Sequence, residues 1–289
     1  MTVPLSINDA GWVAGAAGSG STFEGFLRTP DGSITTFQVT GTNNIGVGGM
    51  NSSNVITGWA NNNGGLAEGF VRAADGTITT FQVSGAENTS ASSINDSGIA
   101  VGFFGDGHGE YGFVRTPDGS ITQFDVPGAS STFPVSINNN DEIAGYYQVG
   151  GGPFHGFLRL PNGEITTFDA PGCDLDNVSG INSSGEIAGF CTEGFSFVRL
   201  KKGSFITISK GRKQLDANAI NGNGTTTGTI SGRKTGVGFI RTAKGKLTKF
   251  EVPDKSRGTT PFAINSSGVV TGESYYSLQS YGFLYTTNK

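Results

Sequence analysis

Few residues of this chain belong to types that carry out chemistry, and the densest group of them surrounds one histidine. His108 stands between Asp106 and Glu110 in a segment that is rich in glycine. An imidazole that titrates near neutral pH, flanked by carboxylates, has the groups for acid and base catalysis or for metal binding. The same segment fits a solvated loop equally well. Both interpretations stay open, although a total of two histidines excludes a three-histidine zinc site.

Two further residues have side chains that could transfer a proton, namely His155 and Glu193. His155 occupies a recurring position of the repeat described below, which favours a structural role. The sequence contains no nucleophile elbow, Walker-type loop, Cys-x-x-Cys pair or dinucleotide fingerprint. The catalytic residues are therefore undetermined, with His108, Glu110, His155 and Glu193 as candidates, and we expect no cofactor and no metal ion.

Turns such as Asn8-Asp9-Ala10-Gly11 resemble calcium loops at first sight. They are too short and carry too few carboxylates for that ion. The side chains of Asn and Asp form hydrogen bonds with the nearby backbone in Asx turns, which explains this composition without an ion.

An internal repeat positions these candidate residues. A first phrase, made of a small residue, an apolar residue and Asn, occurs seven times, and a Gly follows seven residues after each Asn. A second phrase, typically Gly-Phe-aliphatic-Arg, follows each first phrase, and a third phrase related to Ile-Thr-Thr-Phe occurs six times. The asparagines are Asn8, Asn51, Asn95, Asn138, Asn182, Asn221 and Asn265, and the phenylalanines of the second phrase are Phe26, Phe70, Phe113, Phe157, Phe197, Phe239 and Phe283. A period of about 40 to 50 residues is typical of propeller blades.

The phrases are short, rich in β-branched and aromatic residues, and bounded by Asn, Asp, Gly and Pro. These properties predict β-strands joined by tight turns. Each repeat then supplies four antiparallel strands, which we call A to D in chain order. Because one such sheet cannot bury both of its faces, neighbouring sheets must stack, and we expect the recurrent Phe residues to fill the space between them.

We therefore predict an all-β fold, a seven-bladed β-propeller of four-stranded repeats of ~42 residues each. A single domain spans residues 1–289, with repeats at approximately 1–44, 45–88, 89–131, 132–175, 176–216, 217–259 and 260–289. The seventh repeat lacks the third phrase. Either the last blade has three strands, or a strand upstream of Met1 in a longer parent completed it. Met1 and Lys289 are expected to lie close together.

The phrases Ser-Ile-Asn-x-x-Gly-x-Ile-x-Gly, His155-Gly156-Phe157-Leu158 and the Ile-Thr-Thr-Phe-Asp-x-Pro-Gly stretch at residues 165–172 resemble the HAF-type repeats of bacterial, extracellular proteins. The resemblance covers essentially the whole chain. It implies a secreted or cell-surface β-propeller and carries over no activity or catalytic residues. This chain departs from the pattern at the histidine position, so a ring of identical histidine ligands is excluded. The other six repeats have Glu24, Glu68, Tyr111, Phe195, Val237 and Tyr281 there.

Comparison of the repeats with one another separates uniform turns from variable loops. The B to C and D to A loops vary in length and chemistry, and in a propeller both sets emerge on the same face. Exposed aromatic rings beside polar groups suit a sugar or another flat polar ligand, whereas the alternative role of these rings is to pack loops onto the blades. The predicted ligand-binding residues are Trp59, Phe103, Phe104, Asp106, His108, Tyr111, Phe133, Tyr146, Tyr147, His155, Tyr275 and Tyr276.

The chain has two cysteines, Cys173 and Cys191, and both fall on the variable face of the fifth repeat. A disulfide between them agrees with the export that the resemblance implies, because disulfides persist in oxidising compartments. It requires a Cα separation of under about 7 Å. The sequence leaves the bond open.

The formal net charge is −4 and the sequence pI is near 5.2. Phosphate binding needs a basic face, so we expect no nucleic acid partner. No apolar run is long enough to cross a membrane, and Met1 precedes no export signal in the chain as given. We expect a monomer that is extracellular or periplasmic.

Three hypotheses about function follow. The first is a binding propeller that presents variable aromatic and polar loops to a carbohydrate, a peptide or another small ligand. The second is a lyase or hydrolase with acid and base residues at the mouth of the channel. The third is a structural or adhesive surface protein. Two or more ionisable side chains within hydrogen-bonding reach at the channel mouth would favour an enzyme, whereas aromatic rings there would favour binding.

Overall fold

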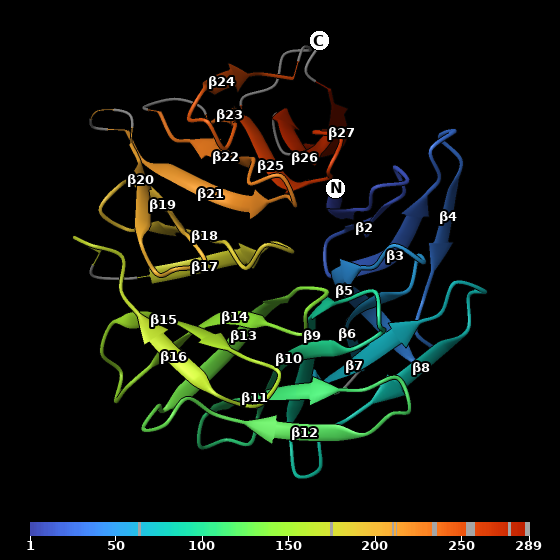
Figure 1. Cartoon of the computed structure of the whole chain (residues 1–289). Coiled ribbons are helices and arrows are strands. Elements are labelled where there is room, and N and C mark those ends of the chain that lie inside the picture. Colours follow the sequence, from blue (N-terminus) through green and yellow to red (C-terminus); the bar gives the residue numbers. More distant parts are fainter. Residues whose placement is uncertain are drawn as a thin grey trace.

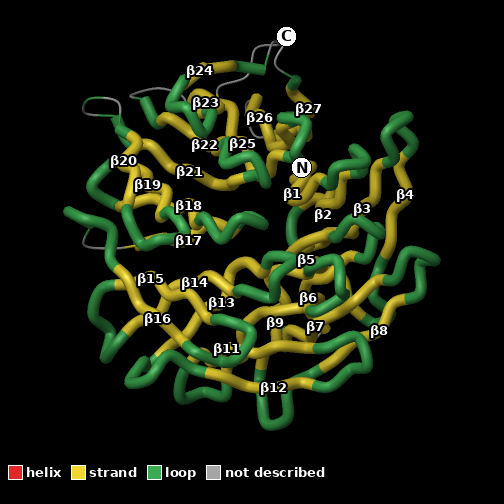
Figure 2. The backbone as a smooth tube through the Cα atoms, in the orientation of Figure 1, coloured by secondary structure: helices red, strands yellow, loops and turns green. Residues whose placement is uncertain are grey.

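The computed structural model describes residues 1–62, 65–173, 176–209, 211, 213–232, 236–252, 258–276 and 279–286. This part of the chain forms 27 β-strands and no helix (Figures 1 and 2). Consecutive strands pair antiparallel into seven sheet units, six of four strands and a last one of three. A single parallel residue pair, Glu110 of β11 (Glu110–Arg115) with Ser131 of β13 (Ser131–Ile137), joins the third and fourth units.

Each unit has its strands in the order predicted as A to D. The A strands are β1 (Thr2–Ile7), β5 (Thr42–Met50), β9 (Asn88–Ile94), β13 (Ser131–Ile137), β17 (Asp176–Ile181), β21 (Leu215–Ile220) and β25 (Gly258–Ile264). The B strands are β2 (Val13–Ser19), β6 (Ile56–Asn62), β10 (Ala100–Gly105), β14 (Ile143–Gln148), β18 (Ile187–Cys191), β22 (Thr226–Ile230) and β26 (Val270–Tyr276).

The two outer sets complete the units. The C strands are β3 (Thr22–Arg28), β7 (Ala67–Arg72), β11 (Glu110–Arg115), β15 (Phe154–Arg159), β19 (Ser196–Arg199), β23 (Val237–Arg241) and β27 (Gln279–Tyr285). The D strands are β4 (Ile34–Phe37), β8 (Ile78–Phe81), β12 (Ile121–Phe124), β16 (Ile165–Phe168), β20 (Phe205–Ile208) and β24 (Leu247–Phe250).

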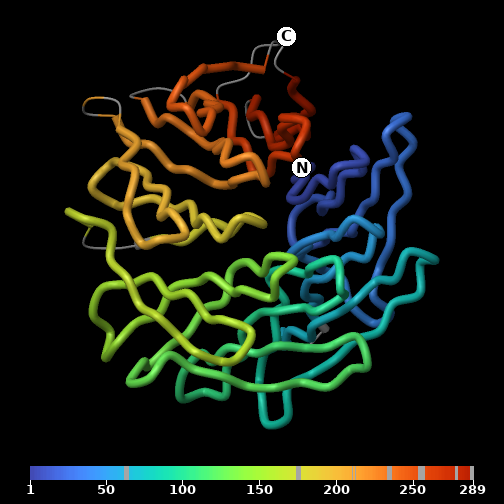
Figure 3. Tube along the Cα trace, in the orientation of Figure 1, coloured from blue at the N-terminus to red at the C-terminus, as the bar shows by residue number. Residues whose placement is uncertain are grey.

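The seven units form a closed ring around a central axis, which the chain traces once from its first to its last strand (Figure 3). Each A strand contacts the A strand of the next unit, and β25 contacts β1. The A strands therefore line a central channel. No D strand pairs with β27 within the described residues, so the seventh unit has three strands there. The predicted closeness of Met1 and Lys289 cannot be followed, since Lys289 lies outside the described residues.

Phenylalanines of the D strands fill the space between units, as predicted. Phe37 lies over Gly25 of the neighbouring C strand, where a Cβ would come within 2.2 Å of its ring. The ring also packs edge-on against Phe70 of the next unit at 6.1 Å, and the guanidinium of Arg72 lies over it at 5.1 Å. Such pairs add about 0.5–1.5 kcal/mol beyond the burial of area. The same arrangement recurs with Phe81, Phe124 and Phe168.

The fifth unit shows why glycine is required in the others. Its D strand carries Ile208 in place of Phe, and its C strand carries Ser196 opposite, in place of Gly. The smaller Ile side chain leaves room for the serine, whose hydroxyl oxygen accepts a hydrogen bond from the amide N–H of Ala217 at 2.8 Å. The pairing of Gly with Phe is thus steric.

The seven repeat asparagines form a closed ring of hydrogen bonds. Each Nδ2 donates to the backbone carbonyl oxygen of the asparagine in the next unit at 2.9–3.3 Å, and Asn265 donates to Asn8 across the junction of the last and first units. Each Oδ1 accepts the amide N–H of the residue four positions later. The expected Asx role is therefore present, and the buried side chains also link the units.

Candidate binding site in the central channel

The two ends of the channel differ in chemistry. The end formed by the A to B turns carries the asparagine ring and has a cavity of about 270 Å³, lined by residues such as Asn138, Asn182 and Ser183. The end formed by the variable loops has a cavity of about 550 Å³, within the usual range for small-molecule sites. Its lining residues are Leu5, Val47, Gly48, Ser179, Phe190, Asp216, Asn218, Thr229, Ser231, Thr260 and Phe262.

Strand geometry explains why this lining mixes apolar and polar groups. Most lining residues lie on A strands, because these strands border the channel. Phe190 and Thr229 lie on B strands, at the position that follows the repeat glycine. The B strand of each unit packs against the A strand of the next, so this position faces the gap between two units near the channel.

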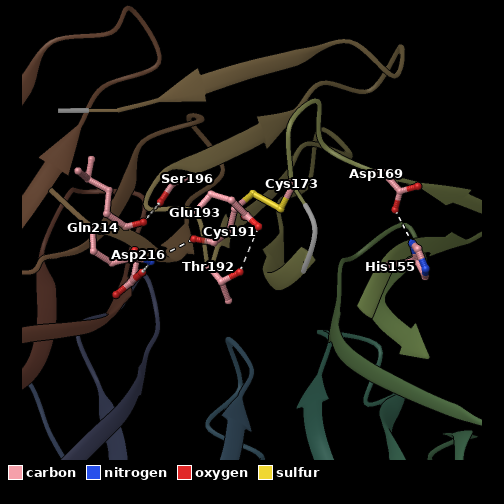
Figure 4. Close-up of a disulfide and its surroundings, with 10 residues drawn as sticks. His155, Asp169, Cys173, Cys191, Thr192, Glu193, Ser196, Gln214 and Asp216 are labelled. Carbon is pink, nitrogen blue, oxygen red and sulfur yellow. Dashed lines mark hydrogen bonds and ion pairs between the residues drawn. A yellow bond between two sulfur atoms is a disulfide. The ribbon is translucent and has the colours of Figure 1, made fainter. Parts of the chain in front are cut away.

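Asp216 supplies the negative charge of the cavity. The amide of Gln214 holds its carboxylate, since Nε2 donates to Oδ1 at 2.8 Å and also to the carbonyl oxygen of Cys191 at 3.0 Å (Figure 4). Thr229 lies opposite Asp216 in the strand register and also lines the cavity. A carboxylate held in place is suited to hydrogen-bond a polar ligand, while Phe190 and Phe262 provide apolar surface.

The ring of sheets resembles several solved structures. Virginiamycin B lyase from Staphylococcus aureus matches with a TM-score of 0.66 over 99% of this chain and 95% of that chain, at 13% sequence identity. A prolyl endopeptidase matches with a TM-score of 0.70 over 98% of this chain and 50% of that chain, at 11% identity. TolB from Acinetobacter baumannii matches with a TM-score of 0.57 over 82% of this chain and 62% of that chain, at 10% identity.

These neighbours are β-propeller proteins. The chain is a β-propeller. The predicted fold class is thereby confirmed, and each sheet unit is a blade. At such low identities the likeness shows the fold alone. No protein-family model and no curated protein matches the sequence.

Three of the predicted aromatic residues, Phe103, Phe133 and Tyr146, form one cluster with Phe154 between blades three and four. Phe133 of β13 contacts Phe103 at 5.3 Å and Tyr146 at 5.1 Å, and Phe154 packs against Phe133 and Tyr146. All four are half-buried. Their rings lie against one another and fill the space between the blades, and none of them lines the described cavity.

Other predicted ligand residues also have protein partners. Phe104 is buried and contacts the half-buried ring of Tyr111 at 5.4 Å. The Trp59 ring covers Gly46, where a Cβ would come within 2.3 Å of it. Tyr275 and Tyr276 are exposed at the end of β26. Their role in binding stays a prediction.

The Asp106 to Glu110 segment forms a turn around the aspartate. The Asp106 carboxylate accepts the amide N–H groups of His108 at 2.9 Å and of Gly109 at 3.3 Å, and the His108 side chain is exposed. Burial raises the pKa of the Glu110 carboxyl, and the nearby charge of Asp106 raises it further. These contacts favour the loop interpretation of the segment over an acid and base pair.

His155 lies on the outer part of blade four, away from the cavity lining. Its Nδ1 pairs with Oδ1 of Asp169 at 2.7 Å (Figure 4), and its ring lies against Tyr147 at 5.3 Å. The side chain is 30% exposed. The contacts attach the third strand of the blade to the segment after its fourth strand, which agrees with a structural role.

Cys173 and Cys191 form a disulfide with a Cα separation of 5.5 Å (Figure 4). The bond that the sequence left open is therefore present. It joins the loop before β17 to the end of β18. The carbonyl oxygen of Cys191, at that end, accepts a hydrogen bond from Gln214 Nε2. Glu193 lies in the turn that follows and accepts a hydrogen bond from Thr192 Oγ1 at 3.3 Å.

Sequence reasoning missed a buried acid, Glu273, on β26. The side chain is 4% exposed, and Oε1 accepts a hydrogen bond from the Tyr275 hydroxyl. Burial raises the pKa of this carboxyl by more than the nearby Ser280 hydroxyl lowers it. The residue follows the B-strand glycine, the position at which Phe190 and Thr229 line the cavity in blades five and six.

The position that follows the B-strand glycine could have been singled out from the sequence as a candidate for the site. Neighbouring strand positions are nearly uniform among the repeats, whereas this one changes in chemistry from blade to blade. The seven residues are Ala16, Trp59, Phe103, Tyr146, Phe190, Thr229 and Glu273.

Proposed function

We propose that the channel cavity at the variable-loop end binds a small polar ligand with an apolar face, of which a saccharide is the best-fitting class. The observation that carries this proposal is the lining itself. Two phenylalanine residues provide a surface for C–H groups, and the polar residues Asp216, Thr229 and Asn218 line the same volume.

The enzyme hypothesis predicts at least two ionisable groups at this mouth. Among the described residues that line the cavity, Asp216 is the one acid, and no histidine takes part. One neighbouring structure is a catalytically inactive histidine-to-alanine variant of virginiamycin B lyase with quinupristin. In this chain His108 and His155 lie outside the lining, which supports binding rather than lyase or hydrolase chemistry.

The compartment proposed with this function is extracellular or periplasmic. The resemblance to HAF-type repeats and the disulfide support it, because a disulfide persists in an oxidising environment. Within the described residues no helix is long and apolar enough to cross a membrane. We propose that the protein acts as a monomer.

A glycan array followed by calorimetry tests the proposal. We expect at least one neutral or acidic glycan to bind, with Phe262→Ala and Asp216→Asn each lowering the affinity about tenfold, equivalent to ~1.4 kcal/mol. Ser183→Ala is the matched control, because Ser183 lines the cavity at the opposite end of the channel and its side chain is exposed.

Three results would count against it. They are silence of the array across both glycan classes, unchanged affinity in both cavity variants, or an equal loss in the Ser183→Ala control. Turnover of a bound glycan that Asp216→Asn abolishes would instead support the hydrolase or lyase hypothesis.

A further inference from the structure

The strand positions that border the channel cavity carry a single charge. Most of the lining comes from two positions of the A strands, the third and the fifth residue before the repeat asparagine. Leu5, Ser179, Asn218 and Phe262 lie at the third position, and Asp216 and Thr260 lie at the fifth. In none of the seven repeats is either position occupied by Lys, Arg or His, and Asp216 is the one acid among them.

A neutral group holds the Asp216 carboxylate in place. The Gln214 amide donates from Nε2 to Asp216 Oδ1 at 2.8 Å and to the Cys191 carbonyl oxygen at 3.0 Å (Figure 4). An amide orients the carboxylate but brings no positive charge to it. Across the part of the chain that the structure describes, His155 and Asp169 form the one ion pair, so no described cation balances Asp216.

The remaining walls of the cavity do not balance this charge either. Leu5, Phe190 and Phe262 are apolar, and Asn218 and Thr260 are neutral. A concave site that carries one sign of charge between apolar walls raises the local concentration of ions of the opposite sign. The cavity should therefore favour a cationic ligand over a neutral one of the same shape, and disfavour an anionic one.

We infer that the channel cavity is selective for ligands that carry a protonated amine, and that amino sugars are the class of saccharide it takes. This inference rests on the proposed function, because it concerns the ligand of the same cavity. The ammonium group pairs with the Asp216 carboxylate, while the C–H face of the sugar lies against Phe190 and Phe262. Asp216 then determines specificity, and the two phenylalanines contribute affinity for charged and neutral sugars alike.

Two disaccharides that differ in one kind of group test this selectivity. Cellobiose has a hydroxyl group at C2 of each ring, and the β-1,4-linked disaccharide of glucosamine has an amine there. The titrations are run by calorimetry at about pH 6, below the ordinary pKa of an amine. We expect the wild-type protein to bind the amino disaccharide about tenfold more tightly than cellobiose, a difference that charge pairing readily supplies.

Asp216→Asn should bring the two affinities within about threefold of each other, because it keeps the size of the side chain and removes its charge. Phe262→Ala is the matched control, since Phe262 lines the same cavity without carrying a charge. It should weaken the binding of both disaccharides and leave the ratio of their affinities unchanged. The comparison on the wild-type protein needs no variant, so it stands even if a variant fails to fold.

Equal affinity of the two disaccharides for the wild-type protein would overturn the inference and leave saccharide binding intact. So would a preference for the amine that survives Asp216→Asn. Silence toward both sugars would count against the proposed function, and phenylethylamine beside phenylethanol then decides the charge preference without a sugar. A preference for that amine that Asp216→Asn removes would support the inference, whereas equal binding of the two compounds, or none, would overturn it.

Discussion

At the scale of single residues, the asparagine turns show what local sequence reasoning reaches and what it misses. The Asx role of these residues follows from turn chemistry and is present in all seven repeats. The second hydrogen bond, from each Nδ2 to the next blade, depends on the stacking of sheets that lie about forty residues apart in the chain. Local spacing does not contain that information.

Asn51→Ala should destabilise the fold by about 2–3 kcal/mol. The change removes the bond from Nδ2 to the Asn95 carbonyl oxygen at 3.1 Å and leaves the amides of Ser53 and Val55 without their acceptor. A buried polar group left unpaired costs about 1–3 kcal/mol. Urea unfolding measures the loss. Ser53→Ala is the control, because the Ser53 side chain is exposed and the change keeps the backbone amide that donates to Asn51 Oδ1; an equal loss there would refute the assignment.

The free energy of unfolding should depend on pH through Glu273, the buried acid on β26. Its pKa in the folded chain is raised above the ordinary value of 4.5 by burial, so the protonated form favours folding at low pH. This contribution is lost as the pH rises from about 4.5 through the raised pKa. Glu273→Gln should therefore raise the free energy of unfolding at pH 7 by about 1 kcal/mol and change it little at pH 4.

The measurement is the difference between wild type and variant in urea unfolding at the two pH values, since other carboxyls titrate in the same range. Glu24→Gln, which alters an exposed carboxylate, is the control. A variant that is less stable than wild type at pH 7 would show that the charged form is favoured in the fold.

At the scale of strands, phenylalanine and glycine residues determine how the blades pack. The sequence predicted that the repeat phenylalanines fill the space between blades, and the structure places them there. It did not predict which glycines they cover, because that contact depends on the register between C and D strands. In blade five Ile208 replaces the phenylalanine and Ser196 replaces the glycine, which shows that the phenylalanine ring is what excludes a side chain at the glycine position.

Gly69→Ser should destabilise blade two by about 1–3 kcal/mol, because a Cβ there would lie 2.4 Å from the Phe81 ring. Phe81→Ile removes that clash but also the contact with Phe113. The double variant should be more stable than the sum of the two single changes predicts, by about 1–2 kcal/mol of coupling. Thermal unfolding of all four proteins measures this. Additive effects would mean that the two side chains do not compete for space.

The disulfide joins two segments of blade five and belongs to the same scale. Closing a loop of this length stabilises a fold by about 3 kcal/mol in the chain-entropy model. Cys173→Ser with Cys191→Ser should lower the melting temperature and weaken ligand binding, because Gln214 holds Asp216 from the Cys191 carbonyl oxygen. An unchanged melting temperature would refute the stabilising role.

At the scale of the whole molecule, ring closure follows from a repeat that cannot bury its own faces. The period, the strand order and the sharing of one face by the variable loops were all predictable. The cavity was not, since all but one of its lining residues lie on strands rather than in the variable loops. Phe262 and Asp216 look like ordinary strand residues, and only the convergence of A strands brings them together.

Within the described residues, the seventh blade and the first blade share no sheet at the junction where the ring closes. The A strands β25 and β1 contact each other, Asn265 bonds to Asn8, and the Ser266 amide donates to Asp9 Oδ1 at 2.8 Å. These contacts close the ring at the axis.

The most direct test is to locate the bound ligand by NMR. With the tightest glycan from the array, amide resonances of Phe190, Asp216, Thr229 and Phe262 should shift, while those of Asn138, Asn182 and Ser183 at the other end of the channel should not. Shifts confined to the asparagine end, or to the outer edges of the blades, would contradict a binding site in the variable-loop end of the channel.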